Sequence, residues 1–359
     1  MSFGSILIAE HLSNYNTENL HKSEVHLNLL KVVNQKRLRV KVEYYLDVGI
    51  KLLKYNNTVE TITMYFPFSF VAKDIEDLGK KLSNSKPLVN VIFNENMQYG
   101  GNVEGRSSLN KYRSTLGNET ERKIRSFVLY NLAEDNYIVE PIDLDGYCGT
   151  SLTIQLTGVR LPDAEKHENL YFRFRLPINE NNQKWLKRDE NLSNDVFQAA
   201  FSKTELYDIR INDRRETSDK VLEKIEKDNT LLPFVRTHFF FVTSVVDQVT
   251  NGTLEQMDTR MMELDRWEDY MPYEDKHPRI AYQWKKIVDE NSAYDNFEIF
   301  FRNTCDNRNY RKILLYLFVA FWIGAVGSTI ANIGLKWGNV SWVVVLMTII
   351  IVGCYFRKP

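Results

Sequence analysis

The residues of this sequence best suited to hold an anion lie in one short run, Tyr171, Arg173 and Arg175. They alternate with apolar residues, so a strand would place the phenol ring and both guanidinium groups on one face. Guanidinium groups bind phosphates, and an aromatic ring can stack on a base. The run predicts a site for a nucleotide or a short single-stranded nucleic acid. The alternative is a solvent-exposed strand face whose arginines pair with neighbouring carboxylates.

A second basic group, Arg106, Lys111 and Arg113, begins in the glycine-rich stretch GGNVEGRS at 100–107. The stretch matches a phosphate-binding P-loop except that Arg106 replaces the lysine. A P-loop also needs a strand directly before it and alternating helices and strands after it, and the sequence predicts neither. We therefore expect a flexible loop from a strand to a helix, without nucleotide hydrolysis. Arg106 joins the run at 171–175 as a candidate ligand-binding residue.

The sequence contains no motif for metal-dependent or nucleophilic catalysis. The six histidines are scattered, and His21 and His26 lie in a helix-like stretch at a spacing that does not share one face. The three cysteines lack zinc-site spacing, and the DLDG stretch at 143–146 departs from a calcium loop after its glycine. We predict no catalytic residue, no metal site and no cofactor, and we interpret the protein as a non-enzyme.

The overall charge gives no further pointer to a ligand. The chain has 359 residues, with 46 Lys and Arg against 47 Asp and Glu, for a formal charge of −1. No global field attracts nucleic acid or acidic lipid, so a local patch must hold any anion. The length is sufficient to bury a core without disulfides or metals.

The elements that would position these residues are mostly strands. Residues 38–50 alternate strictly between apolar and polar, which predicts a long half-buried strand. Residues 238–250 are more continuously apolar and predict a central strand. Further strands are expected at 60–70, 87–93, 125–132, 151–161, 169–178 and 205–211. Short polar turns between them favour antiparallel pairing in a sandwich or barrel.

Helical patterns come later, at 218–228, at 253–271 and in a stretch after Pro278. The fold class expected is a β-rich α+β cytoplasmic domain, an antiparallel sandwich or barrel, followed by a C-terminal transmembrane helical hairpin. We expect a β-rich domain at 1–180, an α+β continuation with a helical connector at 181–311, and the hairpin at 312–359.

The hairpin is predicted from two apolar runs, at 313–335 and 340–356. As a helix the first would extend roughly 35 Å, enough to cross a bilayer. Basic residues flank the pair, and only Lys336 lies in the turn between them. The positive-inside rule then puts both termini in the cytoplasm. We expect a multi-pass membrane protein, in the inner membrane if the source is bacterial, with the lipid bilayer as a partner.

Small and polar residues share one stripe of the first run, namely Ala320, Gly324, Gly327, Ser328, Ala331 and Asn332. Such a stripe lets a second helix come close. A ring of hairpins would give a homo-oligomer with a polar path past Ser328 and Asn332. The alternative is that the stripe packs only against the second helix of the same hairpin.

This order of parts, a recognition domain before a short hairpin of about 45 residues, resembles transmembrane effectors of bacterial antiphage signalling systems, CBASS-like or Hailong-like. The resemblance concerns architecture only. It implies a sensor and effector that binds a nucleotide or oligonucleotide signal and controls a membrane-disrupting pore in antiviral defence. The alternative is a membrane-tethered scaffold or enzyme whose hairpin is only an anchor.

Overall fold

The computed structural model describes residues 4–12, 21–36, 39–55, 59–93, 97–103, 106–115, 118–144, 148–157, 159, 169–190, 202–252, 257–267, 269–272, 278–289, 292–306 and 310–334. The chain divides into two compact units, one of residues 1–190 and 204–304 and one of residues 191–203 and 305–359. This division does not test the boundaries expected at residues 180 and 311, which stay predictions.

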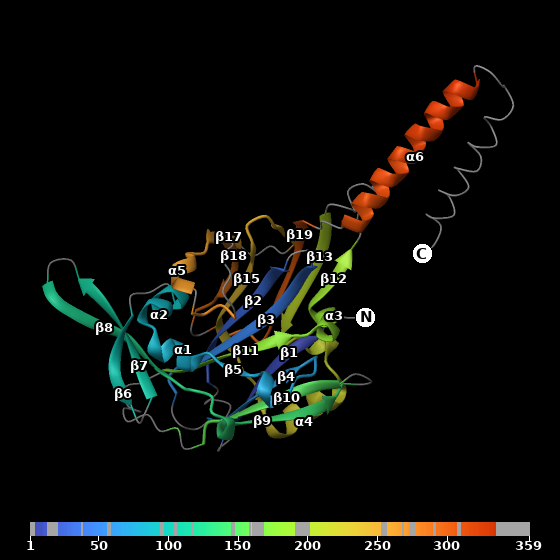
Figure 1. Cartoon of the computed structure of the whole chain (residues 1–359). Coiled ribbons are helices and arrows are strands. Elements are labelled where there is room, and N and C mark those ends of the chain that lie inside the picture. The colour runs from blue at the N-terminus through green and yellow to red at the C-terminus, as the bar shows by residue number, and fades with distance from the viewer. Residues whose placement is uncertain are drawn as a thin grey trace. The chain divides into compact units, whose positions relative to one another are not determined.

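The first sheet has, among the described residues, nine strands in the order β16, β19, β13, β1, β4, β10 and β9, with β12 beside β13 and β14 beside β1 (Figure 1). Their bounds are β1 Ser5–Leu12, β4 Val59–Phe66, β9 Tyr137–Asp143, β10 Cys148–Gln155, β12 Lys187–Glu190, β13 Ser202–Ile211, β14 Thr230–Leu231, β16 Gln248–Asn251 and β19 Phe297–Asp306. The pair β1 and β13 is parallel, and β1 and β4 are antiparallel, so the sheet is mixed.

The second sheet has ten described strands in the order β17, β18, β15, β2, β3, β11, β8, β7 and β6, with β5 beside β11. Their bounds are β2 Ser23–Lys36, β3 Arg39–Leu52, β5 Glu76–Asp77, β6 Met97–Val103, β7 Arg106–Thr115, β8 Asn118–Leu129, β11 Asn169–Ile178, β15 Phe234–Ser244, β17 Met257–Met261 and β18 Arg279–Ile287. The pairs β15 with β2 and β11 with β8 are parallel, while β2 and β3 form an antiparallel pair.

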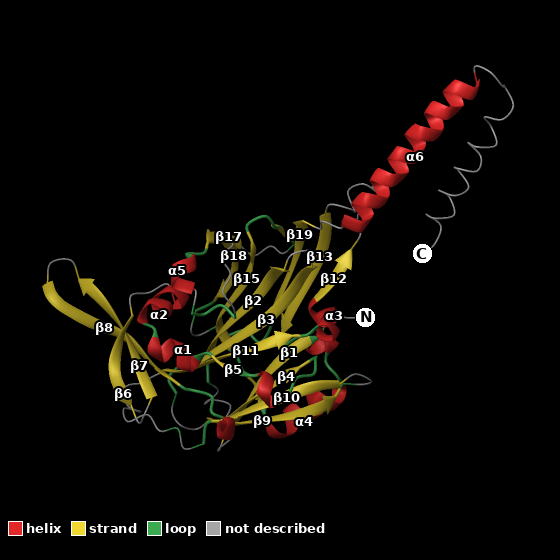
Figure 2. Ribbon diagram, viewed as in Figure 1, coloured by secondary structure: helices red, strands yellow, loops and turns green. Residues whose placement is uncertain are grey.

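The helices are few and short apart from the last (Figure 2). Their bounds are α1 Gly79–Asn84, α2 Lys86–Phe93, α3 Gln183–Leu186, α4 Asp219–Asp228, α5 Leu264–Trp267 and α6 Tyr310–Gly334, with 3-10 turns at Ala72–Asp74, Glu134–Asn136, Glu180–Asn182 and Arg214–Glu216.

The main core lies between the two sheets of the larger unit. Alternate residues of strands from both sheets share one apolar cluster, for example Ile8 and Met64 of the first sheet and Val48 and Phe172 of the second. Helix α4 covers part of the outer face of the first sheet, where Val221 is buried with the residues of β1. The sheets therefore form a sandwich, and the β-rich prediction is confirmed, although the pairing is mixed rather than antiparallel.

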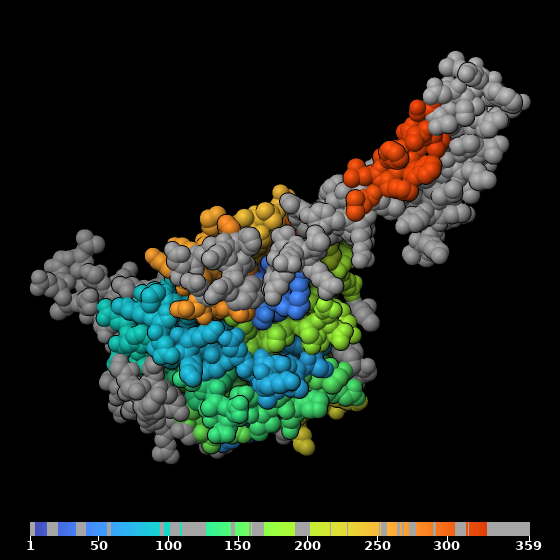
Figure 3. Space-filling view, viewed as in Figure 1, coloured from blue at the N-terminus to red at the C-terminus, as the bar shows by residue number. Residues whose placement is uncertain are grey.

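The outer face of the second sheet is covered in part by α1, α2 and α5. Leu82 and Val89 of the first two helices and Trp267 of α5 are buried with Leu30 of β2 and Val242 of β15. The space-filling view shows the light-blue segment of α1 and α2 close to the orange segment that contains α5 (Figure 3). Segments far apart in the sequence thus roof the same face of the sheet.

Several predicted elements are wrong. Residues 87–93 form helix α2 because Ser85 accepts a hydrogen bond from the amide of Leu88, and Pro87 suits the first turn of a helix. Residues 253–271 contain β17 and α5, because pairing with β18 overrides the helical spacing. The stretch after Pro278 forms β18 and β19. Residues 97–103 and 106–115 form the antiparallel pair of strands β6 and β7, so the glycine-rich stretch is followed by a strand instead of a helix.

The predicted transmembrane hairpin is also corrected. Residues 310–334 form α6, but no helix among the described residues is long and apolar enough to cross a membrane. The predictions of a span at 313–335, a multi-pass topology and a membrane pore are therefore wrong on this finding. The second span, at 340–356, lies outside the described residues.

Candidate functional site

Polar side chains gather on the outer face of the second sheet, under α2 and α5. Strand alternation sends every second residue of β2, β3, β11, β15 and β18 to this face. Register then aligns them in rows across the sheet. One row contains Lys285, His238, His26, Gly49 and Arg173, contributed in turn by β18, β15, β2, β3 and β11. Five strands thus contribute to one continuous polar surface.

The two neighbouring rows differ in character. On one side Arg236, Glu24 and Lys51 are aligned across β15, β2 and β3. On the other side Phe240 and Asn28 are aligned across β15 and β2, with Gln283 beside Phe240 on β18. Successive rows are two residues apart along each strand, a step of about 6.6 Å.

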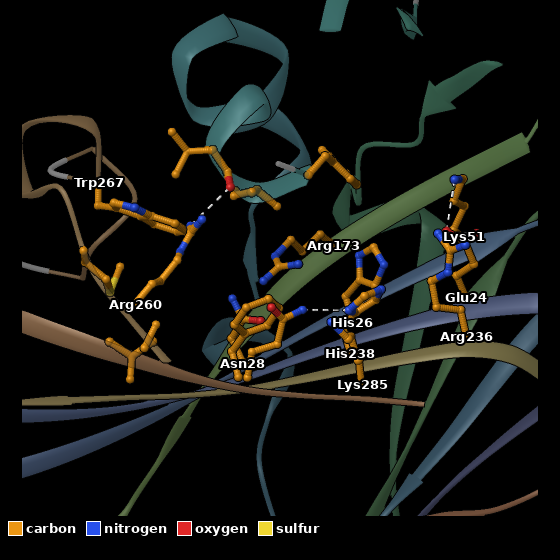
Figure 4. A pocket seen from close by; sticks show the side chains of 18 of the residues that line it. Glu24, His26, Asn28, Lys51, Arg173, Arg236, His238, Arg260, Trp267 and Lys285 are labelled. Carbon is orange, nitrogen blue, oxygen red and sulfur yellow. Dashed lines mark hydrogen bonds and ion pairs between the residues drawn. The ribbon is translucent and has the colours of Figure 1, made fainter. Parts of the chain in front are cut away.

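These rows form the floor of a cavity of about 330 Å³ (Figure 4). Its roof comes from α2 and the segment around α5, through Val91, Phe93, Met262 and Trp267. The volume lies near the lower end of the range of small-molecule sites, about 300 to 1,000 Å³. The cavity is suited to one compact ligand.

The cavity wall is strongly basic. Five of its side chains are cationic, Lys51, Arg173, Arg236, Arg260 and Lys285, and one is a carboxylate, Glu24. Glu24 lies 3.1 Å from Nζ of Lys51 and 3.6 Å from a guanidinium nitrogen of Arg236. Nζ of Lys285 pairs with the exposed Asp258 outside the wall at 2.8 Å. The positive charge of the wall exceeds its negative charge, which favours an anion.

Two histidines occupy the middle of the floor. The rings of His26 and His238 are edge to face with centroids 5.2 Å apart. Burial, with the positive Arg236 nearby, lowers the pKa of His238 to about 4, and burial beside His238 and Arg173 lowers the pKa of His26 well below its usual value. The Gln283 amide donates to Nδ1 of His238 across 2.9 Å. Both imidazoles are therefore neutral near pH 7 and can donate a hydrogen bond without adding a full charge.

Arg173 lies at the inner end of the floor and is 1% exposed. Its Nε donates to the hydroxyl of Tyr270 at 2.8 Å and its Nη1 to the hydroxyl of Tyr171 at 3.0 Å. Its Nη2 has no hydrogen-bond partner, although Asp47 lies 3.9 Å away. Gly49 makes room for this arrangement, because a side chain there would meet the Tyr171 ring and Nη1 of Arg173. The guanidinium is thus fixed by two hydrogen bonds, and its Nη2 can donate a further hydrogen bond to a ligand.

The predicted ligand-binding residues have different positions. Tyr171, Arg173 and Arg175 share one strand face, but this face is buried under the roof rather than exposed. Arg173 lines the cavity, while Arg175 donates to both carboxylate oxygens of Asp47 at 2.6 and 3.0 Å and to the carbonyl of Tyr270. Arg106 begins β7, and its side chain lies outside the described part of the structure. Their role in binding stays a prediction.

The predicted helix-packing residues lie in α6. A Cβ added at Gly324 or Gly327 would meet no atom within 4 Å, and Ser328 is exposed. Ala331 and Asn332 fall within the bounds of α6, but their side chains are not described. The described residues of the stripe therefore show no close helix packing.

Sequence reasoning missed most of the cavity. His26 was assigned to a helix-like stretch, yet β2 has the alternating polar residues Glu24, His26 and Asn28 that would have indicated a polar strand face. His238 begins the segment 238–250, which is interpreted from sequence as a more continuously apolar central strand, and Arg236 lies just before that segment. The parallel pairing of β2 with β15 joins residues more than 200 positions apart, which a local pattern does not reveal.

Comparison with known proteins does not assign this chain to a family. No protein family model matches the chain, and no curated protein matches it significantly. The architectural resemblance to antiphage effectors therefore stays a prediction. Within the described residues, no three His, Cys, Asp or Glu side chains are grouped to hold a metal ion. The cavity geometry is the main guide to function.

Proposed function

We propose that this protein binds a nucleotide, with the phosphate held in the basic cavity on the outer face of the second sheet. The observation that carries the proposal is the buried guanidinium of Arg173, whose Nη2 has no hydrogen-bond partner in a wall that also contains Lys51 and Arg236. An unmet buried donor on a charged group costs free energy. A phosphate oxygen satisfies that donor and offsets the local positive charge.

The neutral histidines support a phosphate in the same place. His26 and His238 lie in the row that ends at Arg173, so an anion over this row meets imidazole N–H donors as well as guanidinium groups. A nearby dianion also favours protonation of an imidazole, which strengthens the interaction. The site therefore adapts to the charge of its ligand.

The size and wall of the cavity favour a nucleotide over a longer nucleic acid. A volume of about 330 Å³ is suited to one nucleotide unit. Phe93, Phe240 and Trp267 supply aromatic surface beside the charged groups, and such surface stacks on a base. The proposal therefore retains the binding of a nucleotide that the sequence predicts, and it does not include a membrane pore.

The test compares a nucleotide with its nucleoside. AMP should raise the midpoint of thermal unfolding in a concentration-dependent way, and adenosine should do so much less, because a ligand of the folded state stabilises it by mass action. Arg236→Gln should weaken AMP binding by about tenfold, the size expected for a charge-assisted hydrogen bond. Arg302→Gln, an exposed arginine on β19, is the matched control.

A scaffold without a ligand gives the opposite result. In that case no phosphorylated compound shifts the unfolding midpoint, and Arg236→Gln and Arg302→Gln behave alike. Equal stabilisation by AMP and adenosine would also contradict a phosphate site.

A further inference from the structure

The cavity changes in chemical character from one end to the other. The rows of Arg236, Glu24 and Lys51, and of His26, His238 and Arg173, contain most of the charged and imidazole groups. One step further along the strands the floor contains Asn28, Phe240 and Gln283, and the next row contains Val242 and Ala281. Figure 4 shows the same order, from Lys51 and Glu24 on the right to Asn28 and Trp267 on the left.

The roof over the less charged end is apolar. Met262 and Trp267 are buried in one cluster with Val242 and Ala281, so apolar groups lie both above and below this part of the cavity. Phe240 of the floor adds a second aromatic ring to the lining. The guanidinium of Arg260 lies at the rim, with a long hydrogen bond to the carbonyl of Val91 at 3.5 Å. A flat ring with polar edges is suited to this environment.

Asn28 is the polar group that distinguishes this end. Its side chain lines the cavity, the residue is 6% exposed, and Oδ1 has no hydrogen-bond partner. A carboxamide presents an acceptor and a donor side by side. A buried carboxamide oxygen without a partner costs free energy, so the arrangement calls for a ligand that donates a hydrogen bond to Oδ1 of Asn28.

We propose that Asn28 recognises an adenine base, with its carboxamide accepting from the exocyclic amine and donating to the neighbouring ring nitrogen. This inference depends on the phosphate site proposed above, which positions the base one or two rows away. A carboxamide is complementary to the adenine edge, where N6 donates and N7 accepts. At this edge hypoxanthine has an oxygen in place of the amine, so it presents two acceptors and is mismatched with the carboxamide. The larger stacking area of a purine favours adenine over cytosine, which shares the amine.

The experiment titrates AMP, IMP and CMP into the wild-type chain and into Asn28→Leu by calorimetry. The wild type should bind AMP about tenfold or more tighter than IMP or CMP, in line with the value of a bidentate base contact. Asn28→Leu should bind AMP and IMP with affinities within about twofold of each other, while binding to the phosphate persists. Asn28→Ser serves as a second variant that shortens the side chain without adding apolar bulk.

The possible failures separate the two proposals. If AMP and IMP bind equally well to the wild type and Arg236→Gln weakens both, the phosphate site stands and adenine recognition by Asn28 is wrong. A preference for CMP over AMP, or an AMP preference that survives in both Asn28 variants, would also overturn the assignment. If the wild type binds none of the three nucleotides, both proposals fail.

Discussion

The imidazole rings of His26 and His238 lie edge to face, with their centroids 5.2 Å apart, at paired positions of the parallel strands β2 and β15. Charged groups approach the pair from several strands: Arg236, Glu24, Lys51, Lys285 and Arg173. The pair is half-buried and its environment is net positive, so the fold favours the neutral form of both rings. The relationship places two uncharged hydrogen-bond donors at the centre of a basic cavity.

The first prediction concerns the pH dependence of stability. The unfolded chain has a histidine pKa of about 6.5, whereas burial near Arg236 lowers the pKa of His238 to about 4 in the folded state. Between these values the unfolded chain binds more protons, so the free energy of unfolding falls as the pH falls from about 6.5 to about 4. His238→Gln should reduce this slope by up to about 1.4 kcal/mol per pH unit.

Urea unfolding at a series of pH values measures the effect, with Lys286→Gln on the neighbouring strand β18 as the control. The difference between wild type and His238→Gln isolates this histidine from the carboxylates that also titrate. Parallel pH profiles for the two proteins would contradict the account.

The second prediction concerns the space over Gly49. A Cβ at this position would lie 3.1 Å from Cζ of Tyr171 and 3.2 Å from Nη1 of Arg173, and it would contact the Tyr171 hydroxyl. Gly49→Ala should therefore displace the guanidinium, lower the free energy of unfolding by about 1 to 3 kcal/mol and weaken AMP binding.

Gly324→Ala is the matched control, because a Cβ there meets no atom within 4 Å. Alanine also favours a helix over glycine by about 1 kcal/mol. Denaturant unfolding and AMP titration of both variants give the comparison, and a Gly49→Ala protein with wild-type affinity would show that Arg173 does not need this space.

The third prediction concerns the buried ion pair beside the cavity. Asp47 is 0% exposed and accepts two hydrogen bonds from Arg175 and one from Tyr270. Asp47→Asn leaves the Arg175 guanidinium with only the more distant Glu76, 3.7 Å from Nη1, as an anionic partner, and we expect a loss of about 3 to 5 kcal/mol in the free energy of unfolding. Glu298→Gln removes an exposed partner of Arg215 and should cost less than about 1 kcal/mol. Equal losses, measured by denaturant unfolding, would contradict a structural role for the buried pair.

Local patterns in the sequence were enough to predict much of the sandwich. The strict alternation before Ile50 corresponds to β3, and the run at 169–178 is β11 with the bounds expected. The helix at 218–228 is α4. In each of these elements the spacing of apolar residues fits only a strand or only a helix, so the sequence alone predicts the element. Residues 87–93 are apolar throughout except for Asn90, so their spacing fits a strand and a helix equally well. The hydrogen bond from the Leu88 amide to the Ser85 side chain favours the helix.

The site was predicted in part, for a reason that concerns tertiary structure. The alternation around Arg173 correctly placed it on one face with Tyr171 and Arg175, but nothing local indicated that α2 and α5 bury that face. His238 meets His26 only because β15 lies parallel to β2. The prediction of a transmembrane hairpin was wrong for another reason. It relied on the lack of charge in the run at 313–335, but no described helix is long and apolar enough to cross a membrane.

The most direct test of the phosphate site uses two adjacent lysines on β18. Lys285 lines the cavity, whereas Lys286 is directed to the other face of the strand and lies over the ring of Tyr294. Calorimetric titration of AMP into Lys285→Gln and Lys286→Gln, at low and high salt, compares two changes of equal chemistry. We expect Lys285→Gln to weaken binding by about threefold to tenfold and to reduce the salt dependence, because one phosphate contact is lost. Lys286→Gln should retain wild-type affinity. Equal affinities in the two variants, or no binding of AMP to the wild type, would contradict the proposed site.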